Sequence, residues 1–94
     1  MPLDIVIFKQ GKEKEYVSID EKLHQLIFSQ DAIKQGRCRE LSKIKDYYLT
    51  DAIFMGKTLT NFIEDLRMLS LPELSPTIKL LEQTEIEKIH ISGD

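Results

Sequence analysis

The pattern of apolar and polar positions first predicts a β-hairpin. Residues 3–9 are rich in β-branched and aromatic side chains, and Gly11 permits the tight turn that follows them. Residues 15–19 alternate between apolar and polar side chains, which predicts a strand returning antiparallel to the first. Both sides of the first strand are apolar, so we expect it to lie centrally in a sheet with each side covered.

A short helix is expected over residues 20–29, where apolar side chains recur at helical spacing. Ser18 and Asp20 are alternative N-caps for this helix. We expect His24, on the same helix, to be partly exposed. Residues 29–36 are mostly polar and suit a loop or one loose turn.

A second helix is expected to begin at Arg37 or Cys38 and to end at Tyr48. Its apolar stripe is narrow and includes Tyr48, so this side chain is expected to face the core. Tyr47 is expected to point elsewhere.

The second half of the chain contains the clearest helix. Residues 49–57 fit either an extended run or an irregular helix, and we leave them unassigned. Thr58 is a good N-cap for a helix over residues 59–69, whose apolar side chains recur at i, i+3, i+4 and i+7. Ser75-Pro76 predicts the start of another helix, and residues 89–91 alternate as a strand does.

Together these elements predict a single α+β domain over residues 1–94. Its expected architecture is a small antiparallel sheet, made of the N-terminal β-hairpin and a C-terminal strand, packed with three to four helices. A chain of 94 residues has room for one hydrophobic core.

Composition narrows the classes of partner. The chain has 13 basic and 16 acidic residues, a net charge of −3, which disfavours binding to the phosphate backbone of nucleic acid. Its one cysteine cannot form an internal disulfide, and neither a leader pattern nor an 18-residue apolar run is present. We therefore expect a cytoplasmic protein that does not insert into membranes.

No catalytic, metal or cofactor site is expected from the reactive residue types. His24 and His90 fall in different elements, and a strand would separate Glu87 from His90 in their Glu-x-x-His pattern. We expect His90 to be a surface residue. Cys38 is the sharpest catalytic candidate, because flanking arginines and a helix start lower a thiol's pKa, but no histidine or second cysteine is near in sequence. A binding protein is therefore expected rather than an enzyme.

The acidic residues suggest where such a protein makes contact. Tyrosine among carboxylates is a common interface composition, and the alternative is that these side chains are ordinary solvated helix faces. The expected partner-binding residues are Asp46, Tyr47, Asp51, Glu64 and Asp65.

A family resemblance adds the kind of partner. The segments that carry it are Tyr47-Tyr48, Asp51-Ala52, Phe54-x-Gly56, the helix over residues 59–69, Val17-Ser18-Ile19, Leu23-His24 and Gly93-Asp94. In these the chain resembles small bacterial immunity proteins of polymorphic or contact-dependent growth inhibition toxin systems. The resemblance implies a protein that neutralises a cognate toxin in the cytoplasm, commonly by covering a nuclease active site.

The expected mechanism is steric and electrostatic blocking of a basic toxin. Charge reversal at Asp46, Asp51, Glu64 or Asp65 is then expected to weaken binding and leave the fold intact. The alternative is a non-catalytic regulatory or adaptor protein that binds a housekeeping protein through the same surface.

Overall fold

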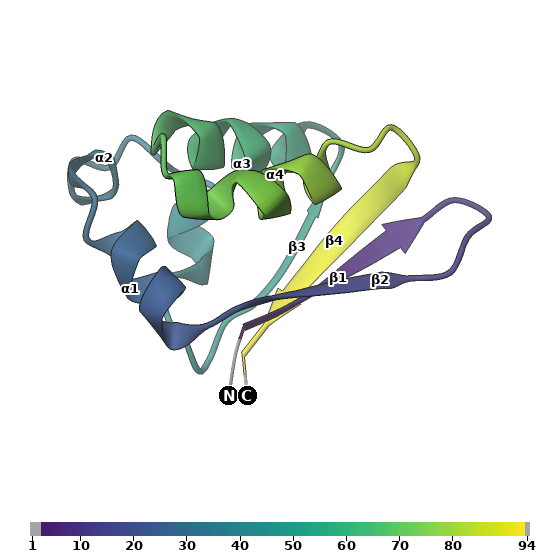
Figure 1. Cartoon of the computed structure of the whole chain (residues 1–94), viewed down its shortest axis with the longest axis horizontal. Helices are drawn as coiled ribbons and strands as arrows, with labels where there is room; N and C mark the ends of the chain where they lie inside the picture. The colour runs from purple at the N-terminus through teal and green to yellow at the C-terminus, as the bar shows by residue number, and fades with distance from the viewer. Residues whose placement is uncertain (1–2, 94) are drawn as a thin grey trace.

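The computed structural model describes residues 3–93 and has the α+β architecture that the sequence predicts (Figure 1). Four antiparallel strands form one sheet in the order β2-β1-β4-β3. The strands are β1 (Leu3–Lys9), β2 (Glu15–Ile19), β3 (Asp51–Met55) and β4 (Ile86–Ser92). The first described residues therefore lie beside the last ones, at one end of the sheet.

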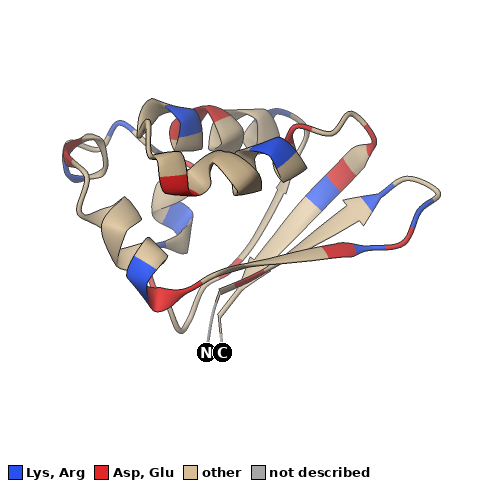
Figure 2. Cartoon of the chain, in the orientation of Figure 1, with Lys and Arg blue, Asp and Glu red and all other residues tan. Residues whose placement is uncertain are grey.

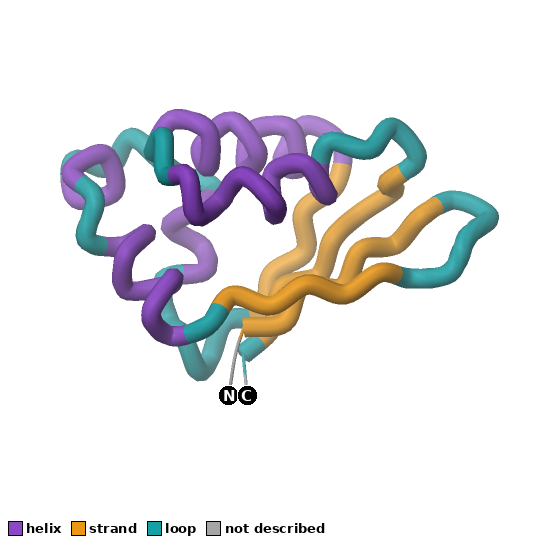
Figure 3. The backbone as a smooth tube through the Cα atoms, viewed as in Figure 1, coloured by secondary structure: helices purple, strands orange, loops and turns teal. Residues whose placement is uncertain are grey.

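The helices are short, apart from one. They are α1 (Glu21–Phe28), α2 (Asp31–Lys34), α3 (Gly56–Met68) and α4 (Ser75–Leu81), with two 3₁₀ turns, η1 (Leu41–Ile44) and η2 (Pro72–Leu74). Figure 3 shows α3 and α4 side by side along one face of the sheet, with α1 and α2 at one end of the molecule. The single turn of α2 is the loose turn expected within residues 29–36.

The N-terminal hairpin and the central position of β1 are confirmed. Leu3 pairs with Ile19 and Ile7 with Glu15 across the hairpin, while β4 pairs along the other edge of β1. Gly11 has a φ of +69°, the left-handed conformation that glycine adopts without strain in a turn. The hairpin thus forms as the alternating pattern and the glycine predict.

The unassigned segment is a fourth strand. Residues Asp51–Met55 pair with β4 at the edge of the sheet, with Phe54 opposite Ile89. Phe54 is fully buried, whereas Ile53 beside it is exposed. Five residues with this mixed exposure carry only a weak strand pattern, and the strand with which they pair lies more than thirty positions away in sequence. The sequence alone therefore left this strand unassigned.

The core lies between the sheet and the helices. Leu3, Ile5 and Ile7 point from β1 into this layer and are fully buried. The apolar stripe of α3 packs mainly against β3 and β4 in the same core, and the rings of Phe54 and Phe62 lie 4.4 Å apart between centroids. Burying each such side chain contributes about 1.5–3 kcal/mol, which makes this layer the main source of stability.

The expectation that both faces of the sheet are covered is wrong. Within residues 3–93, every helix lies on the same side (Figure 1). Val6 and Phe8, on the other side of β1, are only half-buried, and Tyr16 of β2 is 71% exposed. The apolar residues on this side are therefore left partly exposed, because no described helix packs over them.

The helix expected from residue 37 or 38 to Tyr48 is also wrong. Only Leu41–Ile44 is helical, as a 3₁₀ turn that buries Leu41 and Ile44. A spacing of three residues fits one 3₁₀ turn as well as one α-helical turn, so the narrow stripe did not distinguish them. The tyrosines are reversed as a result: Tyr47 is half-buried against the core and Tyr48 is exposed.

The caps differ in detail from the sequence prediction. Asp20, not Ser18, caps α1, because its carboxylate accepts the Leu23 N–H at 2.8 Å. Helix α3 begins at Gly56 instead of after Thr58. Thr58 is the third residue of the helix, and its hydroxyl accepts a hydrogen bond from the Met55 N–H at 3.0 Å. Thr58 therefore still provides a capping hydrogen bond at the start of α3.

Candidate functional site

The clearest candidate surface is the segment between η1 and β3, which we call the 46–50 turn. The Oδ1 atom of Asp46 accepts hydrogen bonds from the backbone N–H of Tyr48 at 3.0 Å and of Leu49 at 2.9 Å. The N–H of Thr50 donates to the Asp46 carbonyl at 3.1 Å, and its hydroxyl donates to the same atom. One side chain and one carbonyl therefore hold the whole turn in a single shape.

The end of the chain supports this turn from behind. The Gly93 N–H donates to the Thr50 carbonyl at 2.8 Å. A Cβ atom at Gly93 would lie only 2.6 Å from the carbonyl oxygens of Tyr47 and Tyr48. Glycine is required here because the two backbones lie in direct contact.

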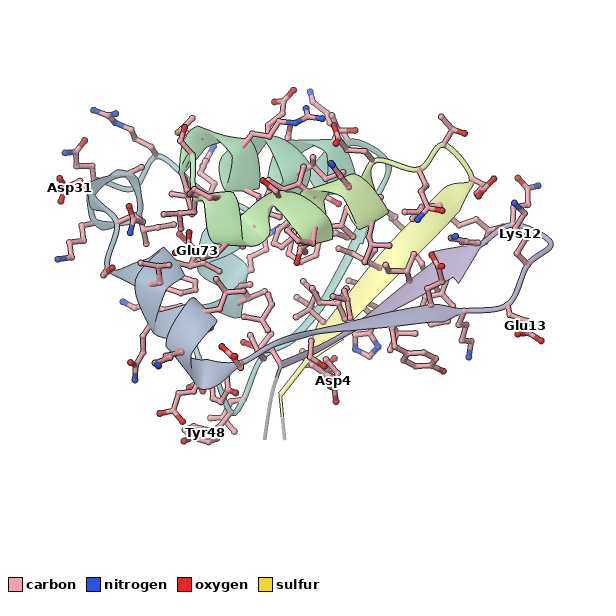
Figure 4. All side chains as sticks on the ribbon, viewed as in Figure 1. Asp4, Lys12, Glu13, Asp31, Tyr48 and Glu73 are labelled. Carbon is pink, nitrogen blue, oxygen red and sulfur yellow. The ribbon has the colours of Figure 1, made fainter. Side chains whose placement is uncertain are left out.

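The turn presents two apolar side chains to solvent. Tyr48 is 56% exposed and Leu49 80% exposed, and Figure 4 shows Tyr48 projecting from the molecule at the end of the sheet. Tyr47 lies beneath, with its ring 5.3 Å from that of Tyr48 in an edge-to-face arrangement. Tyr47 thus supports Tyr48 rather than serving as the outermost contact, and Leu49 has no signal in the sequence beyond being apolar.

His24 fixes the other side of Tyr47, and the expectation that this histidine is partly exposed is wrong. Its side chain is buried, its Nε2–H donates to the Ile44 carbonyl at 2.9 Å, and its ring packs against Phe28 and Tyr47. The hydrogen bond satisfies a polar atom that would otherwise be costly to bury. His24 therefore connects α1 to η1 and to the base of the 46–50 turn.

Asp51 follows the turn as the first residue of β3. Its side chain is largely exposed, and its Oδ1 lies 2.5 Å from Nε2 of His90 on the neighbouring strand. His90 is thus at the surface, as expected. Of the predicted contact residues, the structure places Asp46, Tyr47 and Asp51 together, around the 46–50 turn.

Glu64 and Asp65 lie elsewhere, on α3. That helix covers the inner face of the sheet, whereas Asp51 belongs to the opposite face. The carboxylates of Glu64 and Asp65 line a shallow hollow of about 460 Å³. Its other charged lining residues include Arg37, Arg39 and Lys43. Figure 2 shows acidic and basic positions interspersed over the helices. The five predicted residues therefore form two separate groups instead of one acidic surface.

Two of the four carboxylates chosen for charge reversal, Asp46 and Asp65, accept hydrogen bonds from backbone N–H groups. Asp65 Oδ2 accepts the N–H of Glu40 at 3.0 Å and of Leu41 at 3.1 Å, and Asp46 orders its own turn. Reversing either charge removes these hydrogen bonds, so the expectation of an intact fold does not extend to these two residues. Asp51 and Glu64 remain suitable for such a test.

Cys38 lacks the surroundings that a nucleophile needs. The residue is fully buried, and burial raises the pKa of its thiol above the ordinary value, an effect that nearby Asp65 reinforces. Arg37 acts in the opposite direction and is outweighed. The flanking arginines therefore do not produce a reactive thiolate.

We also searched the described residues for a metal site and for a membrane-spanning helix. Within residues 3–93, no three His, Cys, Asp or Glu side chains come close enough together to hold a metal ion. In the same range, every helix is too short or too polar to cross a membrane.

Comparisons with protein-family models, with curated proteins and with solved structures found no match. The fold and the site define a small α+β protein with a preorganised, apolar-tipped turn at one end of its sheet.

Proposed function

We propose that this chain is an immunity protein that binds and neutralises a cognate bacterial toxin through the 46–50 turn. The observation that carries the proposal is the exposure of Tyr48 and Leu49 on a turn whose backbone is held by the Asp46 carboxylate. The toxin itself is inferred from the sequence resemblance.

The physical case rests on preorganisation. A turn that is already ordered loses little conformational entropy on binding, so more of the contact energy appears as affinity. Tyrosine is among the side chains that dominate binding energy at protein interfaces. A convex turn with an aromatic tip suits a concave partner surface such as an enzyme's active-site cleft.

Charge supports a basic toxin. The chain carries a net charge of −3, and the largely exposed carboxylate of Asp51 lies next to the turn. Complementary charge accelerates association and suppresses binding to wrong partners. A nuclease domain, whose surface must attract phosphate, fits this requirement.

An adaptor that binds a housekeeping protein is the second candidate function, since the same rigid turn serves any concave partner. The two functions differ in what the partner does alone. An immunity protein's partner arrests growth when it is made without the chain, whereas an adaptor's partner does not.

The experiment begins with purification of the tagged chain from the cells that make it and identification of any protein recovered in equal amount. That protein is then expressed alone and together with the chain. Growth arrest that the chain relieves is the expected result. A harmless partner would replace the immunity proposal with the adaptor.

Two variants test the turn itself. We expect Tyr48→Ala combined with Leu49→Ala to weaken partner binding by at least roughly tenfold and to abolish protection, as hot-spot truncations do. Met68→Ala is the matched control, because Met68 is 51% exposed but lies on α3. Equal affinity of the double variant and the unmodified chain would exclude the turn as the contact.

A further inference from the structure

The uncovered side of the sheet, which we call the open face, has a mostly apolar centre. The register of the strands places four side chains in one row across its middle: Tyr16, Val6, His90 and Ile53. Tyr16 is 71% exposed and Ile53 55% exposed. Removing such surface from water is favourable, and this requires a partner that covers the face.

One end of the open face is basic. Phe8, Lys88 and Met55 form the next row across the strands. The ammonium groups of Lys14 and Lys88 lie 5.0 Å and 4.9 Å from the centre of the Phe8 ring. This cation–π geometry holds both lysines on the open face.

The other end of the open face is acidic. The row on that side of the apolar centre contains Asp4 and Asp51, with Ser18 and Ser92 between and beside them. Asp4 and Asp51 are both exposed, and Figure 4 shows Asp4 on the side of the sheet away from the helices. In Figure 2 the middle of the strands is uncharged and coloured bands lie toward their ends.

We propose that the open face binds the open face of a second copy of this chain. A two-fold axis that lies between the two sheets and runs across the strands reverses the strand direction of one copy. That operation places the basic end of each copy over the acidic end of the other and the apolar row over itself. An axis along the strands would instead bring like charges together.

Self-complementarity is the reason to choose a second copy as the occupant. A two-fold interface uses the same patch twice, so the patch must carry both members of every opposite-charge pair. The open face meets this condition with Lys14 and Lys88 at one end and, at the other, Asp4 and Asp51, of which Asp51 also contacts His90. The paired charges also offset the repulsion between two chains of net charge −3.

The proposed dimer goes beyond toxin binding. Tyr48 and Leu49 lie on the 46–50 turn, outside the strand rows that make up the open face. Self-association is measured with the purified chain alone, so its failure and a failure of toxin binding are separate results. Standard stable interfaces bury roughly 800 Å² per partner. Four strands of five to seven residues cover a smaller area than this, so we expect micromolar dissociation.

The first measurement is sedimentation equilibrium from about 1 to 500 μM protein, a range that brackets micromolar dissociation. The chain is expected to convert from monomer to dimer, and added salt should favour the monomer because it screens the charged ends. Ile53→Asp, which puts a charge into the apolar row, should remain monomeric. A wild-type chain that stays monomeric throughout would overturn the proposal.

A charge exchange tests whether the charged ends of the two open faces oppose each other in the dimer. One variant carries Asp4→Lys with Asp51→Lys, and the other carries Lys14→Glu with Lys88→Glu. Each has two like-charged ends and should be monomeric alone, whereas an equimolar mixture should form a heterodimer, detected by native mass spectrometry from the two masses. A mixture without heterodimer, or variants that dimerise separately, would refute this arrangement.

A control separates the open face from net charge. Glu64→Lys with Glu73→Lys changes the net charge as much as the two aspartate reversals do, but these residues lie on α3 and η2. This control should still form its own dimer. Mixed with the Lys14→Glu, Lys88→Glu variant, it should form no more heterodimer than wild type forms with that variant. Thermal unfolding confirms that each variant is folded, and Asn and Gln replace the reversed charges in any that is not.

Discussion

The amide of Gly93 donates a hydrogen bond to the carbonyl of Thr50 at 2.8 Å, which joins the end of the chain to the start of β3. These residues are 43 positions apart, yet their contact shapes the surface that we propose binds the toxin. Because Gly93 has no Cβ atom, the backbone of the turn lies directly against it.

Gly93→Ala should therefore destabilise the protein. The added methyl group would lie 2.6 Å from two backbone carbonyl oxygens, which must move to admit it. We expect a loss of about 1–3 kcal/mol in the free energy of unfolding, measured by urea denaturation.

Gly36 is the matched control for that substitution. It has a φ of +74° and open space around its Cα, so an alanine there is strained but meets no neighbour. Asparagine tolerates this conformation better than alanine does. At position 36, the asparagine variant should therefore be more stable than the alanine variant, whereas at position 93 it should not. A more stable asparagine variant at both positions would mean that the close approach of the carbonyl oxygens is not the cause at Gly93.

Asp65→Ala should loosen the segment that leads into η1. Its carboxylate accepts two backbone N–H groups, from Glu40 and Leu41, and their loss leaves partly buried donors unsatisfied. We expect a decrease of about 1–2 kcal/mol in the free energy of unfolding. Glu64→Ala, the exposed neighbour, should change it by less than about 0.5 kcal/mol, and equal effects would contradict the assigned role.

Cys38 should react slowly in the folded protein. Burial raises the pKa of its thiol and also blocks access of the reagent. We expect the rate of modification by a disulfide reagent near neutral pH to rise at least roughly a hundredfold in denaturing urea, where opening of the fold no longer limits access. Rapid modification without urea would restore the nucleophile hypothesis.

Glu15 should make stability depend on acidic pH. The hydrogen bond from Lys9, whose Nζ lies 2.6 Å from Oε1, lowers the pKa of this carboxyl, with Gln83 adding to the effect. A folded-state pKa below the unfolded one stabilises the fold above the unfolded value, about 4.3, and this contribution is lost as pH falls through the folded value.

Glu15→Gln should consequently lose less stability than wild type between about pH 5 and pH 3, the range that spans the ordinary glutamate pKa. Melting temperatures recorded across this range provide the measurement. Glu13→Gln, at an exposed position in the same hairpin, should follow the wild-type curve. A Glu15→Gln curve parallel to that of wild type would show that the Lys9 contact does not persist in solution.

The sequence by itself determined the elements that local chemistry specifies. Alternation and a glycine turn predict the β1–β2 hairpin, and the unbroken apolar period predicts α3, because these patterns act over a few residues. Composition named Asp46, Tyr47 and Asp51 as candidate contact residues, and the structure places these three around one turn.

Only the tertiary structure decided the rest. The strand β3 exists because its five residues pair with β4, and η1 replaces a longer helix because His24 and Asp65 bind its backbone from distant elements. A period of two separates the faces of β1 but does not say which face the helices cover. The exposure of Tyr48 and Leu49, and the bare side of the sheet, follow from contacts between residues far apart in the chain.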